Sequence, residues 1–186
     1  MELTFPRIAK ENTWLKEASI ILGASIFIAL CAPFSIRLPF NPVPIVLQNH
    51  IILLMAAFLG SRRATLAVLA FLAQALVGLP VLASGKIGIL AFTGPTGGYL
   101  IGYIAAAYVV GRLVERRKNP GSIRAIASFL AGSLCVFFFG VMHLASFIGF
   151  EKALLVGVVP FIPCDLIKTI VCVRLLKGFS SQEPLA

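Results

Sequence analysis

Acidic side chains are scarce in this sequence. Its 186 residues include 7 acidic and 16 basic ones, and charged residues make up 12% of the chain against 59% hydrophobic. Soluble domains carry about 25% charged residues, so the composition excludes an ordinary water-soluble protein and predicts an all-α integral membrane protein. The basic residues punctuate apolar runs instead of forming a polar surface, which argues against nucleic-acid binding. We therefore expect a lipid bilayer, and no nucleic acid, around this chain.

Several chemical motifs are also missing. The four cysteines form no Cys-x-x-Cys pair, and the two histidines are isolated, so we expect neither a metal site nor a disulfide framework. No nucleophile elbow or carboxylate pair points to an enzyme, and no cofactor is expected. The single Gly-Lys pair, Gly85-Lys86, is followed by Ile87 and is not a nucleotide-binding loop. Active uptake by this chain would therefore depend on another protein or on an ion gradient.

Six apolar runs are long enough to span a bilayer or nearly so. They cover residues 18–36, 45–60, 64–79, 97–114, 123–147 and 153–176. With a cytoplasmic N-terminus, the inner segments hold twelve basic residues and the outer ones three, a strong bias under the positive-inside rule. We predict six transmembrane helices with both termini in the cytoplasm. Residues 1–17 are expected to remain as an interfacial segment, 18–177 to form the substrate-binding domain, and 178–186 to be a short tail.

One charged pair lies inside the last apolar run. Asp165 is the only aspartate in the chain, and Lys168 follows three residues later, on the same face of a helix. Pro163 suits the first turn of a helix, which places Asp165 near a positive helix end. Charges within a membrane usually mark function. The alternative is an internal ion pair that only neutralises two buried charges.

Two other polar stretches could share a cavity with this pair. Thr93 to Tyr99 is rich in glycine and leads into a helix, which is typical of an anion-binding nest; a tight loop that needs positive φ is the alternative. Gln48 follows a proline-rich loop and begins a helix, as Asp165 does. Two polar helix starts on the outer side could face one cavity.

Small residues recur at four-residue or similar spacing in the first run. Such stripes let helices approach closely. They favour a partner-subunit interface or packing within the bundle, and the sequence leaves both open for Ser19, Gly23, Ser25 and Ala29.

Five motifs, taken in order, resemble one known family. They are Asn-Pro-Val-Pro-Ile-Val-Leu-Gln ending at Gln48, Leu-Gly-Ser-Arg-Arg ending at Arg63, Gly-Leu-Pro-Val ending at Val81, Gly-Pro-Thr-Gly-Gly-Tyr from Gly94, and Asp-x-x-Lys at Asp165. Together they resemble the BioY family, the biotin-specific S components of energy-coupling-factor (ECF) vitamin transporters.

The resemblance implies a biotin pocket near the outer side of the plasma membrane and partnership with a transmembrane coupling protein and two ATPase subunits. The biotin-binding residues it implies are Asp165, Lys168, Gly94, Thr96, Gly97, Gly98, Tyr99, Gln48 and Lys86. Asp165 suits the ureido N–H groups, and either Lys168 or the glycine loop suits the carboxylate. Where the family has a glycine-rich run, this chain has Leu-Ala-Ser-Gly-Lys ending at Lys86, which either shifts ligand preference or lies at a lid. A gradient-driven carrier, or an enzyme or sensor that uses Asp165 and Lys168, remains the alternative.

Overall fold

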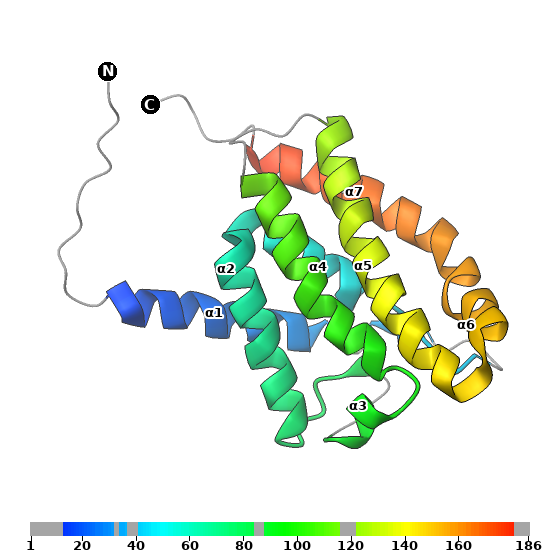
Figure 1. The fold of residues 1–186 in the computed structure, drawn as a ribbon. Coiled ribbons are helices and arrows are strands. Elements are labelled where there is room, and N and C mark those ends of the chain that lie inside the picture. Colours follow the sequence, from blue (N-terminus) through cyan, green and yellow to red (C-terminus); the bar gives the residue numbers. More distant parts are fainter. Residues whose placement is uncertain (1–12, 32–33, 37–40, 84–87, 116–121, 181–186) are drawn as a thin grey trace.

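The protein is almost entirely helical (Figure 1). A computed structural model describes residues 13–31, 34–36, 41–83, 88–115 and 122–180. Its helices are α1 (Thr13–Leu30), α2 (Gln48–Leu76), α3 (Leu90–Thr93), α4 (Gly97–Glu115), α5 (Ser122–Ile148), α6 (Phe150–Gly157), the 3-10 turn η2 (Val159–Phe161) and α7 (Ile162–Ser180). A short antiparallel pair joins β1 (Ser35–Ile36) to β2 (Ile45–Val46), with Ser35 opposite Val46.

Helices of membrane-spanning length dominate the fold. Within the described ranges, four segments are long and apolar enough to cross a bilayer: Gln48–Leu76, Gly97–Glu115, Ser122–Ile148 and Phe150–Gly178. Large apolar side chains such as Leu134, Phe138 and Ile167 are exposed, whereas Gln48, His50 and Thr169 are buried. An apolar exterior around buried polar groups is what a bilayer favours. The prediction of an all-α membrane protein is confirmed.

α2 changes direction at Gly60. This residue has φ 80° and ψ 172°, a conformation that favours glycine, and in Figure 1 the part of α2 before it runs behind α4 while the part after it runs alongside α4. The Glu115 carboxylate accepts hydrogen bonds from the Ser61 backbone N–H (2.7 Å) and hydroxyl (2.8 Å). It thereby caps the second half of α2. The gap between the predicted runs 45–60 and 64–79 is thus a break at one residue, because Ser61 to Arg63 are already helical.

α4 lies between α2 and α5 and packs closely against both (Figure 1). A Cβ atom at Gly98 would lie 2.3 Å from the Phe139 carbonyl oxygen, and one at Gly102 would lie 2.8 Å from the Val136 Cα atom. At Gly111 it would lie 2.4 Å from the Ser61 nitrogen. Glycines on two faces of α4 therefore set its distance from both neighbours.

The last predicted span is broken where its prolines lie. α6 ends at Gly157, η2 contains Pro160, and α7 begins at Ile162 with Pro163 in its first turn. The prediction that Pro163 lies in the first turn of a helix is confirmed, and Asp165 lies in the same turn of α7. Between the predicted runs 64–79 and 97–114 the structure adds the short helix α3.

The four small residues of the α1 stripe divide into two that pack against the core and two that are exposed. Ser25 is buried, and its hydroxyl accepts a hydrogen bond from Gln74 Nε2 (2.9 Å), while Ala29 packs against the core. Ser19 and Gly23 are exposed, and nothing lies within 4 Å of a Cβ atom built at Gly23. Packing in the bundle accounts for Ser25 and Ala29, and the outer pair remains a candidate for a partner contact.

The close contact of α4 and α5 can be tested by adding a methyl group. We expect Gly98→Ala to lower the free energy of unfolding by about 1–3 kcal/mol, because the new Cβ atom would overlap backbone atoms of α5 that cannot move aside. Gly23→Ala, in an open helical position, should be neutral or slightly stabilising. Melting of both variants in detergent measures the difference, and equal midpoints would contradict this packing.

Candidate functional site

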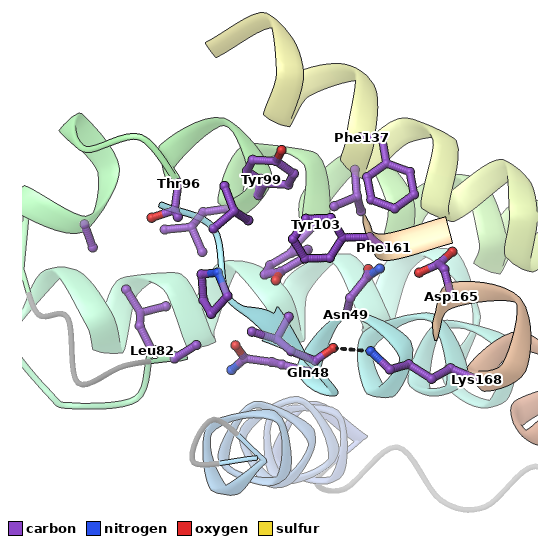
Figure 2. Close-up of a pocket in the computed structure, with 17 residues that line it drawn as sticks. Gln48, Asn49, Leu82, Thr96, Tyr99, Tyr103, Phe137, Phe161, Asp165 and Lys168 are labelled. Carbon is purple, nitrogen blue, oxygen red and sulfur yellow. Dashed lines mark hydrogen bonds between the residues drawn. The ribbon is translucent and has the colours of Figure 1, made fainter. Parts of the chain in front are cut away.

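A cavity opens among α2, α4, α5 and α7, where α2, α4 and α7 begin (Figure 2). It contains about 760 Å³ of empty space, a figure that includes space open to solvent. Its aromatic lining comes from Tyr99, Tyr103, Phe137 and Phe161. Its polar lining comes from Gln48, Asn49, Thr96, Asp165 and Lys168. The predicted meeting of the polar starts of α2 and α7 at one cavity is confirmed.

Asp165 lies between this cavity and a buried histidine. Its Oδ1 atom is 3.6 Å from His50 Nδ1, and Asp165 is 8% exposed while His50 is fully buried. The other ring nitrogen of His50, Nε2, lies 3.2 Å from the Thr169 hydroxyl on α7. The positive end of α7 therefore stabilises a carboxylate at the cavity wall, and the imidazole lies beside it, just beyond hydrogen-bond distance. His50 thereby links α2 to α7.

Lys168 reaches across to the strand before α2. Its Nζ atom donates a hydrogen bond to the Val46 carbonyl oxygen (2.8 Å), which Figure 2 shows as the dashed line. In the described part of the chain, no ion pair joins Asp165 to Lys168, since the partner of Asp165 is His50. The two groups are therefore not simply an internal pair that cancels two charges. The Asp165 carboxylate, which accepts hydrogen bonds, and the Lys168 ammonium group, which donates them, line the same cavity without being paired to each other.

Gln48 is fixed by contacts to other elements. Its Nε2 atom donates to the carbonyl oxygens of Ile28 (3.2 Å) and Val81 (3.3 Å). The amide thus links the start of α2 to the end of α1 and to the loop after α2. Gln48 lines the cavity as predicted, and its position is set by these bonds.

The predicted glycine loop divides into lining and packing residues. Thr96 and Tyr99 line the cavity. Gly94, Gly97 and Gly98 do not lie among the lining residues, and none of them has positive φ. The need for glycine is steric: a Cβ atom at Gly97 would overlap the Phe92 carbonyl group. The Gly94 carbonyl oxygen lies 3.1 Å from His143 Nε2, so this histidine links α5 to the segment before α4.

One predicted site residue cannot be placed. Lys86 lies outside the described residues.

Twelve of the 17 lining residues were missing from the predicted site, and four of these twelve are polar or aromatic. Tyr103 follows Tyr99 by one helical turn, so the i, i+4 spacing could have identified it. Asn49 is the neighbour of Gln48, and Phe161 lies in the proline-rich stretch before Asp165. Phe137 comes from the middle of α5, and no local pattern marks it. Its ring lies 6.4 Å from that of Phe161, so the two close one side of the cavity together.

A polar and aromatic cavity walled by apolar helices defines a multi-pass membrane protein that binds a small organic molecule. The BioY family model matches residues 7–184, and the chain therefore belongs to the BioY family.

Individual relatives agree over most of the chain. The biotin transporter BioY of Rhizobium etli is 39% identical over 173 residues, covering 88% of this chain and 92% of that protein. The biotin transporter BioY of Thermotoga maritima is 39% identical over 165 residues, covering 88% and 96%. A crystal structure of the S-component for biotin from an ECF-type ABC transporter matches with a TM-score of 0.82 and 32% identity, covering 94% of this chain and 96% of that one.

The link from Lys168 to Val46 can be tested in the protein without ligand. Lys168→Met keeps most of the side chain and removes the donor. Hydrogen bonds from charged groups contribute about 1.5–3 kcal/mol, so we expect backbone amides of residues 41–47 to exchange about ten times faster. Hydrogen-exchange mass spectrometry measures this, with Lys152→Met, which changes an exposed lysine of α6, as the control. Unchanged exchange in this segment would contradict the link.

Proposed function

We propose that the chain is a biotin-specific S component, which captures the vitamin at the outer side of the plasma membrane and releases it inward. The observation that carries this proposal is the single cavity lined by both Asp165 and Lys168. The names of the relatives and of the solved structure support biotin as the ligand. Binding requires no covalent step, which agrees with a transport family and argues against an enzyme.

The polar groups of biotin suit the two ends of this cavity. The ureido N–H groups can donate hydrogen bonds to the Asp165 carboxylate. The ureido oxygen can accept a hydrogen bond from Lys168. Figure 2 shows Thr96 on the other side of the cavity from Asp165 and Lys168. We therefore place the ring at Asp165 and the carboxylate toward Thr96 and the start of α4. Lys86 and the neighbouring glycines stay secondary candidates for the carboxylate.

Aromatic side chains separate these two polar ends. Tyr103 and Phe161 lie between Thr96 and Asp165 in Figure 2, and both are buried. Burial of the apolar ring and chain of biotin against such groups contributes about 25 cal/mol per Å². The cavity thus offers a polar, an apolar and a second polar region in the order in which biotin presents them.

The proposed topology has six membrane helices with both termini in the cytoplasm. The break at Gly60 divides α2 into two helices, and α6, η2 and α7 together form one crossing. With α1, α4 and α5 this makes six. The excess of basic residues on the proposed inner side supports the orientation.

The energy for uptake would come from other subunits. We propose a transmembrane coupling protein and two ATPase subunits as partners. The sequence contains no ATP-binding loop, and the similar solved structure is the S-component of an ECF-type ABC transporter. The exposed small residues Ser19 and Gly23 of α1 are candidate contacts for the coupling protein. A gradient-driven carrier is the alternative that the experiments below exclude or support.

Neutralising the acidic group tests the site. We expect Asp165→Asn to weaken biotin binding at least ten-fold, about 1.4 kcal/mol, because an amide is a weaker acceptor than a carboxylate. Binding of radiolabelled biotin to purified protein measures the loss. Glu151→Gln is the matched control, since Glu151 is exposed on α6 and lies outside the lining of the cavity. If the Asp165 variant binds like the parent, the site assignment fails.

The energy source is tested by uptake into cells. We expect biotin accumulation to require coexpressed coupling and ATPase subunits and to stop when an ATPase active site is inactivated. Accumulation by this chain alone that an uncoupler abolishes would show a gradient-driven carrier instead.

A further inference from the structure

Asn49 has a polar atom with no protein partner. It is the second residue of α2, it lines the cavity and it is 7% exposed. Its Oδ1 atom is buried and accepts no hydrogen bond from any described residue. Buried side-chain oxygens are nearly always paired, so this acceptor requires a donor that the fold does not supply.

The surroundings of Asn49 show where that donor must come from. Of its chain neighbours, Gln48 donates to the carbonyl oxygens of two other elements, and His50 faces Thr169 and Asp165. Figure 2 shows the Asn49 side chain between Tyr103 and Asp165 at the cavity. Asn49 therefore borders the cavity in which we propose that the ligand binds.

We infer that Asn49 is a specificity-determining residue that binds the polar ring of the ligand beside Asp165. Its Oδ1 atom accepts a hydrogen bond from one N–H group of the ligand, while the Asp165 carboxylate accepts a hydrogen bond from a second N–H group. This inference rests on the proposed function. An amide is neutral and can both accept and donate, so next to a single carboxylate it favours a neutral cyclic urea over a cationic ring of the same shape.

Two substitutions separate this role from packing. Asn49→Leu keeps the approximate volume and removes both polar atoms. We expect it to weaken biotin binding at least ten-fold. Asn49→Asp adds a second carboxylate. It should shift selectivity toward 2-iminobiotin, in which a guanidinium replaces the urea, and raise its affinity relative to biotin at least ten-fold, because a cation between two carboxylates is stabilised.

Gln74 provides the matched controls. It is a partly buried amide on the same helix and lies outside the cavity lining. Gln74→Leu and Gln74→Glu make the same chemical changes away from the ligand, and we expect neither to change the ratio of the two affinities. Calorimetric titration of each purified variant with biotin and with 2-iminobiotin measures the ratio.

The outcomes distinguish this inference from the proposed function. If the parent protein binds no biotin, the proposed function fails, and the role of Asn49 in binding it fails too. If the parent binds biotin but Asn49→Asp leaves the affinity ratio unchanged, only the assignment of Asn49 is overturned. Equal losses in Asn49→Leu and Gln74→Leu would show an effect on the fold and would also overturn it. Because the ratio compares two ligands in one variant, it stays decisive even if Asn49→Leu does not fold.

Discussion

A carboxylate held inside an apolar bundle is the constraint on which the rest of this structure depends. A buried charge needs a favourable field. Asp165 obtains this field from the first turn of α7 and lies 3.6 Å from His50 Nδ1. This turn lies inside the bundle because the helical segment from Phe150 to Ser180 is interrupted at Pro160 and Pro163. The break, the buried histidine and the cavity are therefore parts of one arrangement.

The cavity also requires helices whose first turns lie inside the protein. α2 begins with Gln48 and Asn49 at the site, and α4 begins nearby with Gly97. Helix starts present N–H groups and a partial positive charge, which suits anionic parts of a ligand. Glycines of α4 keep α2 and α5 close to it, so these starts are held by rigid packing. A site that binds without chemistry needs this preorganisation more than it needs reactive groups.

Local patterns in the sequence predicted the features that local chemistry decides. The proline break, the first-turn position of Asp165 and the break near Gly60 all follow from preferences of a few neighbouring residues. Long-range contacts were not predictable in this way. Lys168 bonds to a carbonyl oxygen 122 positions away, and Gly98 is glycine because of Phe139 on another helix. The glycine loop was therefore expected to bind an anion, although packing explains Gly97 and Gly98. Asn49 was missed because its role depends on a missing partner, which only the assembled cavity reveals.

The central claim is that this chain alone forms a binding site for the ring of biotin. Calorimetric titration of the purified parent protein, without any partner subunit, tests it most directly when biotin is compared with pimelate, a carboxylate with a similar chain and no ring. The account predicts saturable one-to-one binding of biotin and none of pimelate at the same concentration. Folded protein that binds neither, or that binds both equally well, would contradict it.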